Sequence, residues 1–281
     1  MRRYFASRQQ PAIGRVLVAC LCVLQISIVF AHSDLVLNIQ QLTDEIRQSP
    51  RDHALYTTRG NLYRQHSEWN KANDDFNKSL ELLADNANAL ISLGRTHLEA
   101  GKYQSAVVVL SRYLSLYPDD VRALILRSRA YQKLAQYQAA IDDAAAYMLN
   151  SPRVTPAMYF DKARLHELAK DYAGAVDTLE TGLKKLTSAV ILVKYAIELN
   201  VQHHQYEAAL KNFDYLTPRF AAMPVWLSKR ADILVLMKRT TEAAENYRLA
   251  RKAFHALPAS RRNSPANQQL ERHIHARIAG S

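Results

Sequence analysis

The sequence predicts an all-α fold: a right-handed superhelical solenoid of about six helix-turn-helix repeats with capping helices at its ends. Three observations lead to this prediction. An aromatic residue returns about every 34 positions, an alanine follows it by three, and a small residue precedes it by nine. A fixed period of this size is typical of stacked repeats, in which each unit is one supersecondary element.

The repeat register becomes clear when the equivalent positions are lined up. The aromatic position holds Trp69, Tyr103, Tyr137, Tyr172, Tyr206 and finally Thr240. The alanine position holds Ala72, Ala106, Ala140, Ala175, Ala209 and Ala243. The small position holds Gly60, Gly94, Ser128, Ala163, the exceptional Ile197, and Ala231. These matches in one register predict a single structural unit that recurs along the chain.

Each unit is predicted to be a pair of helices, as the second repeat illustrates. Leu90 and Leu93 belong to one apolar stripe at helical spacing, and Ala106 and Leu110 belong to another. Gly101 lies between the stripes and can end the first helix. Because one pair cannot cover its own apolar face, successive pairs are expected to stack.

These residues resemble the tetratricopeptide-repeat family, whose pattern is W-x2-L-G-x2-Y, then A-x3-F, then P. In the second repeat the match rests on Leu90, Leu93, Gly94, His97, Ala106, Leu110 and Pro118. In the first repeat it rests on Tyr56, Gly60, Tyr63, Ala72 and Phe76. The resemblance covers roughly residues 53–256 and implies a superhelix that binds a protein or peptide in its concave groove.

The N-terminal segment has the layout of a secretory signal peptide. Four arginines and no acid precede a mainly apolar run, residues 16–31, which ends in the small residues Val29 and Ala31 before His32. The run is short for a spanning helix, which needs about 20 apolar residues. We therefore expect an exported protein, in a bacterial periplasm or another secretory space. Anchoring to the membrane by an uncleaved signal is the alternative.

The two cysteines agree with export. Cys20 and Cys22 both lie in the predicted signal, so the mature chain would have no disulfide, thiolate metal site or cysteine nucleophile. The apolar run continues beyond Cys20, which distinguishes the segment from a lipoprotein signal.

Four segments are predicted along the chain. They are a signal peptide (1–31), an N-terminal capping helix (32–50), the repeat domain (51–256), and a basic linker with a C-terminal capping helix (257–281). Leu270, Ile274 and Ile278 give the last helix one apolar stripe. Such terminal helices shield the outermost core of a solenoid.

The charge balance is basic, with 37 Lys and Arg against 26 Asp and Glu. Residues 251–281 carry a marked excess of basic residues, with Glu271 as the single acid. A basic protein favours nucleic acid, anionic membranes or acidic proteins. The predicted export makes nucleic acid the least favoured of these partners, and a well-hydrated surface is the simplest interpretation of the basic segment.

No pattern in the sequence indicates a catalytic centre, a cofactor or a metal. It has no Gly-rich phosphate loop, no H-E-x-x-H and no nucleophile elbow. His97 and His166 occupy the repeat position of Tyr63 and Tyr131, which predicts half-buried packing roles. We therefore expect a protein that is not an enzyme and has no cofactor.

A groove is predicted from the resemblance, because in this family the first helix of each pair lines the concave surface. The residue after the small position faces it, and so does the residue four positions earlier. The predicted peptide-binding groove comprises Asn61, Ile91, Arg95, Ile125, Arg129, Phe160 and Arg164. The arginines would hold carboxylates in a two-pronged grip, beside an apolar strip. In the last two repeats the charge reverses, to Glu198 and Asp232.

The alternative for these arginines is internal pairing. Glu99 lies one helical turn from Arg95, and Asp161 and Glu167 lie three residues from Arg164. Ion pairs of this kind on an exposed surface contribute little to stability.

The function predicted from the sequence is a non-catalytic interaction scaffold or adaptor that binds a protein or peptide, with an acidic partner favoured. One alternative is an accessory subunit of an envelope enzyme or assembly complex. Another is a binder of polyanions or membrane surfaces through the basic C-terminal segment. Contact with a membrane is otherwise expected only if the N-terminal segment stays uncleaved. Salt dependence separates these classes, because binding to a polyanion weakens steeply with salt.

Overall fold

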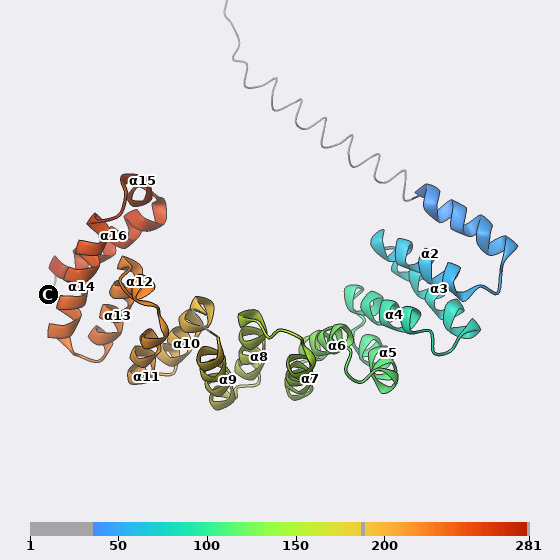
Figure 1. Cartoon of the computed structure of the whole chain (residues 1–281), viewed down its shortest axis with the longest axis horizontal. Helices are drawn as coiled ribbons and strands as arrows, with labels where there is room; N and C mark the ends of the chain where they lie inside the picture. Colours follow the sequence, from blue (N-terminus) through green and yellow to red (C-terminus); the bar gives the residue numbers. More distant parts are fainter. Residues whose placement is uncertain (1–35, 187–188, 280–281) are drawn as a thin grey trace, which may run out of the picture. The chain divides into compact units, whose positions relative to one another are not determined.

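A computed structural model describes residues 36–186 and 189–279, and every regular element within them is helical (Figure 1). The predicted signal peptide lies outside these residues. The chain divides into two compact units, with the boundary between Pro118 and Asp119. The predicted repeat domain, 51–256, spans this boundary.

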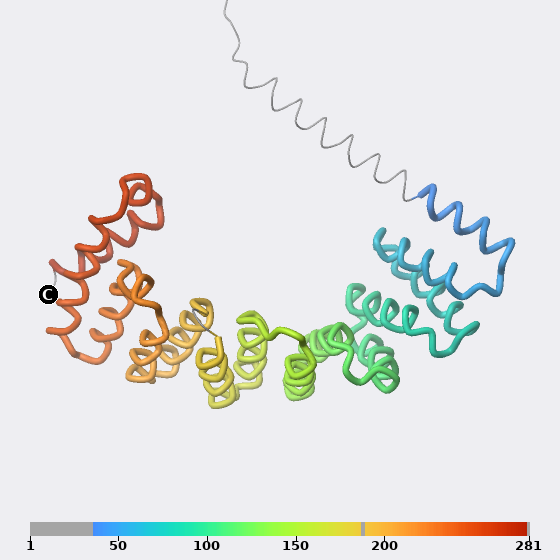
Figure 2. Tube along the Cα trace, in the orientation of Figure 1, coloured from blue at the N-terminus to red at the C-terminus, as the bar shows by residue number. Residues whose placement is uncertain are grey.

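The first unit consists of a helix over residues 36–48 and two helix pairs. The pairs are α2 (His53–Gln65) with α3 (Trp69–Leu82), and α4 (Ala87–Glu99) with α5 (Tyr103–Leu116). From α2 onward each helix of this unit packs against the next in chain order, and α2 also contacts α4. Figure 2 shows the trace reversing direction at each connection.

The second unit continues the same pattern. Its elements are α6 (Val121–Lys133), α7 (Tyr137–Asn150), α8 (Pro156–Leu168), α9 (Tyr172–Lys185), α10 (Val190–Gln202), α11 (Tyr206–Lys211), the 3-10 helix η1 (Asn212–Tyr215), α12 (Pro218–Ala221), α13 (Pro224–Leu236), α14 (Thr240–His255), α15 (Ala259–Arg262) and α16 (Pro265–Ala279). The main pairs are α6 with α7, α8 with α9, and α13 with α14. The prediction of an all-α chain of successive helix pairs is confirmed.

The small and alanine positions are where the two helices of a pair meet. A Cβ atom placed on Gly94 would lie only 2.6 Å from the Leu110 side chain, and one on Gly60 only 2.8 Å from Phe76. Ala106 has no exposed surface. The register inferred from the sequence therefore corresponds to close contact between helices, in interiors packed as densely as crystals.

Each repeat turns between its two helices through one residue with a left-handed backbone. These residues are Ser67, Gly101, Ala135, Lys170, His204 and Lys238, with φ between 57° and 75°. Only one of them is the glycine that this conformation favours. A non-glycine residue in this region costs roughly 1–2 kcal/mol, so packing of the flanking helices holds these turns in place.

The helices α2, α4 and α6 begin at a side-chain cap. Asn86 and Asp120 accept hydrogen bonds from main-chain N–H groups two and three residues ahead, at the starts of α4 and α6. Asp52 caps α2 in a similar way, bonding to the N–H of Ala54. A side-chain oxygen at this position satisfies N–H groups that the helix leaves free.

The fifth repeat departs from the pattern. Its second helix breaks after α11 into η1 and the short α12. Pro218 has no N–H and cannot lie inside a continuous helix, so a new helix, α12, begins there. Asn212, at the start of η1, is buried, and its side-chain nitrogen has no hydrogen-bond partner among the described residues.

Two repeats contain a buried ion pair between their helices. Arg59 binds Asp75 through two hydrogen bonds of 2.8 and 2.7 Å, and Arg127 binds Asp143 at 2.9 and 2.7 Å. In both pairs the aspartate side chain is 7% exposed. Arg59 also donates to Thr43 at 3.1 Å, which ties the helix over residues 36–48 to α2.

At the C-terminal end, α16 packs against α14 with Ile274 buried at the contact. His273 of the same helix bonds to Asp232 of α13 at 2.8 Å. The segment predicted as a linker before this helix contains the short helix α15, which the sequence pattern does not indicate.

Candidate functional site: a cavity between α6, α7 and α8

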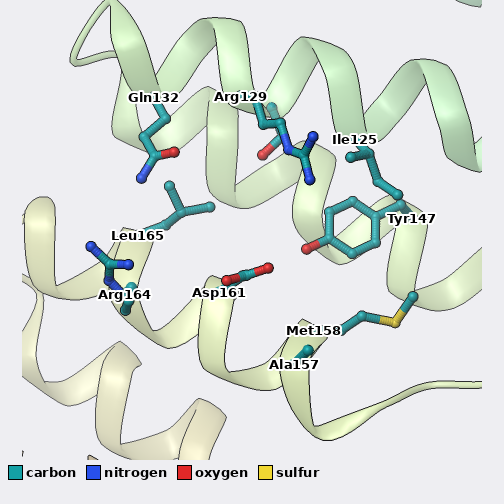
Figure 3. Close-up of a pocket in the computed structure, with 10 residues that line it drawn as sticks. Ile125, Arg129, Gln132, Tyr147, Ala157, Met158, Asp161, Arg164 and Leu165 are labelled. Carbon is teal, nitrogen blue, oxygen red and sulfur yellow. The ribbon is translucent and has the colours of Figure 1, made fainter. Parts of the chain in front are cut away.

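A cavity of about 260 Å³ lies in the second unit, where the helices α6, α7 and α8 meet (Figure 3). The residues that line it are Ile125, Ser128, Arg129, Gln132, Tyr147, Ala157, Met158, Asp161, Arg164 and Leu165. Its wall therefore combines apolar side chains with two guanidinium groups, a carboxylate, an amide and a phenol. Such a mixture is typical of a site that binds with fixed orientation.

Two predicted groove arginines lie at this cavity. Arg129 comes from α6 and Arg164 from α8, and both are exposed. Among the described residues no carboxylate lies within 4.0 Å of either guanidinium, so neither forms an ion pair. The Arg164 guanidinium carbon is 5.9 Å from the centre of the Phe160 ring, a cation–π distance. Both guanidinium groups are therefore available to bind a carboxylate of another molecule.

The acids that could have paired with the groove arginines have other surroundings. Glu99 binds Arg64 at 3.0 Å instead of Arg95. Glu167 accepts a hydrogen bond from the Tyr195 hydroxyl, and this bond together with burial raises the pKa of that tyrosine. Asp161 lines the cavity, beyond ion-pair distance of Arg164.

The apolar strip is present only in part. Ile125 lines the cavity from α6. Phe160 does not: it is half-buried and packs against Tyr195 of α10, with ring centres 4.8 Å apart. Met158 and Leu165 supply the apolar wall on the α8 side instead.

The remaining predicted groove residues belong to the first unit. Arg95 is exposed on α4 and forms no ion pair within the described chain, and Ile91 is half-buried one turn before it. Asn61 is half-buried on α2, where its side-chain nitrogen donates to the main-chain oxygen of Thr57 at 3.0 Å. Thr57 is itself buried and bonded to Ser79 at 2.8 Å.

The two acids of the last repeats are neutralised within the second unit. Glu198 has Lys229 at 3.3 Å and Lys194 at 3.9 Å. Asp232 accepts hydrogen bonds from the Tyr247 hydroxyl at 2.6 Å and from His273, and the Arg277 guanidinium lies 3.9 Å from it. The reversal of charge expected from the sequence is therefore compensated at these positions.

Tyr147 is the site residue that sequence reasoning missed. It comes from α7, the second helix of its pair, whereas the groove was inferred from first helices alone. Its side chain is 6% exposed, and Figure 3 shows its hydroxyl directed into the cavity near Asp161. Burial, with a smaller contribution from the negative charge of Asp161, raises the pKa of Tyr147 to about 12. The repetition of tyrosine at Tyr113, 34 residues earlier, was the available signal.

His97 and His166 have packing and capping surroundings. His97 is half-buried, and burial together with Lys102 lowers its pKa. His166 bonds to Asp171 at 2.8 Å, and Asp171 caps α9 through the N–H of Gly174. Within the residues that the structure describes, no group of three or more His, Cys, Asp and Glu side chains could hold a metal ion.

The comparison with family models identifies the repeat. Residues 63–130, from α2 to α6, match the model of the tetratricopeptide repeat. The tetratricopeptide repeat is thus identified in residues 63–130. No curated protein matches the sequence.

Solved structures show the same fold. A tetratricopeptide repeat protein from Parabacteroides merdae is 16% identical, with a TM-score of 0.52 over 90% of this chain and 97% of that chain. The structure of Naa15/Naa10 bound to HypK-THB is 14% identical, with a TM-score of 0.57, and covers 85% of this chain but only 36% of that chain. At 16% and 14% identity, the similarity between this chain and these two structures concerns the fold alone.

Among the helices that the structure describes, none combines the length and apolar character needed to cross a bilayer.

Proposed function

We propose that this protein is a non-catalytic interaction scaffold, and that it binds an acidic segment of a partner in the cavity between α6, α7 and α8. Tetratricopeptide repeats are packing units that present extended surfaces to partner proteins. The structure of Naa15/Naa10 bound to HypK-THB, one of the similar folds, is that of an assembly of proteins. The partner bound by the scaffold can itself be an enzyme, in which case this protein is its accessory subunit.

The observation that carries the proposal is the pair of uncommitted arginines. Arg129 and Arg164 flank one cavity from two different helices, and neither has an ion-pair partner in the described chain. Charge-assisted hydrogen bonds to such groups contribute about 1.5–3 kcal/mol each. Ile125 and Met158 lie beside them and can contact the apolar part of an acidic side chain. We propose that Arg95 and Ile91 form a second contact on the first unit.

The proposal is tested by binding titrations with matched variants. The partner is recovered by pull-down from the native envelope fraction and titrated against the parent protein. The first variant is Arg129→Ala/Arg164→Ala, which removes two charges from the cavity. The second is Arg261→Ala/Arg262→Ala, which removes two charges from α15.

We expect each cavity arginine to contribute about 1–3 kcal/mol to binding, and the cavity variant to unfold at the same temperature as the parent. The α15 variant should bind almost as tightly as the parent, with a small loss confined to low salt. If the α15 variant loses binding and the cavity variant keeps it, the protein is a polyanion binder instead.

We further propose that the protein is exported, because residues 1–31 have the pattern of a cleaved signal peptide. The N-terminus of the mature protein should then be His32 or a residue close to it. Edman sequencing or mass spectrometry of the purified native protein gives the answer. Recovery of an intact Met1 in the soluble fraction would contradict the proposal.

A further inference from the structure

The cavity holds a carboxylate as well as two arginines. Asp161 lies on α8 three residues before Arg164, so both side chains leave the same face of the helix. Asp161 is exposed, and within the described chain no cation lies within 4.0 Å of it. The cavity therefore has one acceptor group that is as uncommitted as its two cations.

The phenol of Tyr147 adds a donor to the same space. Its side chain is more than nine-tenths buried, and among the described residues its hydroxyl has no hydrogen-bond partner. A phenol is protonated at neutral pH, so this hydroxyl can donate a hydrogen bond to an incoming oxygen. The hydroxyl points into the cavity, so a ligand oxygen that enters there can accept its hydrogen bond.

A ligand that carries carboxylates alone fits this arrangement poorly. Its first carboxylate would meet Arg129 and Arg164, but any further negative charge would face Asp161 in the same cavity. Like charges at short range repel, and they do so more strongly where protein replaces water. A cation beside the carboxylate of the ligand would instead give Asp161 its partner.

The proposed function is the basis for a more specific statement about the ligand. We propose that the cavity selects a dipolar segment, in which an acidic side chain stands next to a basic one: the carboxylate lies between Arg129 and Arg164, and the ammonium or guanidinium group lies against Asp161. The cavity volume of about 260 Å³ suits one or two side chains, because sites for whole small molecules start near 300 Å³. Asp161 then acts as a specificity determinant.

The test uses capped hexapeptides with a glycine–serine background, labelled with a fluorophore, so that no terminal charge contributes. The two central residues are glutamate–lysine, glutamate–glutamate or lysine–lysine. Dissociation constants are measured by fluorescence anisotropy for the parent protein, Asp161→Asn, and Arg129→Ala/Arg164→Ala. Asp177→Asn is the matched control, because Asp177 is an exposed acid on α9 that does not line the cavity.

For the parent and the Asp177→Asn control, we expect the glutamate–lysine peptide to bind at least fivefold more tightly than the glutamate–glutamate peptide. In Asp161→Asn this preference should reverse, because the negative charge that attracts the ammonium group and repels a second carboxylate is gone. Thermal unfolding of each variant establishes that the exposed substitution leaves the fold intact.

Two results overturn the inference. The first is a glutamate–glutamate peptide that binds the parent as tightly as glutamate–lysine does, and the second is a preference that Asp161→Asn leaves unchanged. If binding in those cases is still lost with Arg129→Ala/Arg164→Ala, the proposed function stands without the dipolar selectivity. Both proposals fail if no peptide binds at millimolar concentration. They also fail if the dissociation constants are the same for the parent and for Arg129→Ala/Arg164→Ala.

Discussion

Removal of Asp143 should destabilise the second unit, because the largely buried guanidinium group of Arg127 then loses its carboxylate. Arg127 binds the two carboxylate oxygens of Asp143 at 2.9 and 2.7 Å, and the two side chains are 21% and 7% exposed. Breaking a fully buried pair costs about 3–5 kcal/mol. Since a fifth of the arginine side chain still reaches water, we expect Asp143→Ala to cost about 3 kcal/mol, the lower end of that range.

The matched control is the neighbouring Asp142→Ala. Asp142 is exposed and accepts one hydrogen bond from Gln138 at 2.9 Å, so its loss should change the free energy of unfolding by less than about 0.5 kcal/mol. Urea unfolding followed by circular dichroism measures both variants. If Asp143→Ala costs as little as Asp142→Ala, the ion pair does not contribute to stability as argued.

The repeat register supplies a second arm of the same experiment. In the second repeat the positions of Arg127 and Asp143 hold Leu93 and Val109, which pack in the apolar interior. The double variant Arg127→Leu/Asp143→Val should therefore be about as stable as the parent, since apolar replacement of a buried pair is often neutral or favourable. A double variant that is less stable than Asp143→Ala would show that the two repeats are not interchangeable at this position.

Three further predictions concern packing, turn geometry and pH. Ala106→Leu should overpack the α4–α5 pair and cost about 1–3 kcal/mol; an unchanged thermal midpoint would mean that the register is wrong. Ala135→Gly should stabilise the protein by about 0.5–1 kcal/mol, because glycine tolerates the φ of 57° at this turn, and a lower urea midpoint would contradict this. The N–H of Gly174, followed by the bond to His166, lowers the pKa of Asp171, so its stabilising effect is present above the unfolded pKa and is lost as the pH falls through the folded pKa. Asp171→Ala should lower stability by about 1 kcal/mol at pH 7 and by progressively less toward pH 2, in unfolding measured across that range.

The helix pairs and their contact positions could be predicted from the sequence, because a packing constraint repeats with the period of the fold. A position that must be small in one pair must be small in the next, as Gly94 and Ala106 show. The left-handed turns could not be predicted in the same way. Five of the six residues at these turns are not glycine, so local preference is overridden by the packing of the helices on either side.

The candidate site was only partly predictable for a related reason. Helical periodicity places Arg129 and Arg164 on the exposed face of first helices, and the structure places them at one cavity. The contribution of Tyr147 depends on the angle between two helices, which periodicity does not contain. Phe160 has the right position in the repeat, but Tyr195 on the following pair covers it. The position of a neighbouring helix relative to a residue depends on tertiary packing, which helical periodicity does not describe.

The central claim is that the guanidinium groups of Arg129 and Arg164 receive the carboxylate of the partner. Their side-chain Nε–H signals in nitrogen-15 NMR spectra report on this directly, after assignment by single Arg→Lys substitutions. During titration with the glutamate–lysine peptide, these two signals should shift together and saturate at one dissociation constant, while the signal of the exposed Arg153 stays in place. Shifts of the Arg261 and Arg262 signals, with those of Arg129 and Arg164 unmoved, would contradict the account.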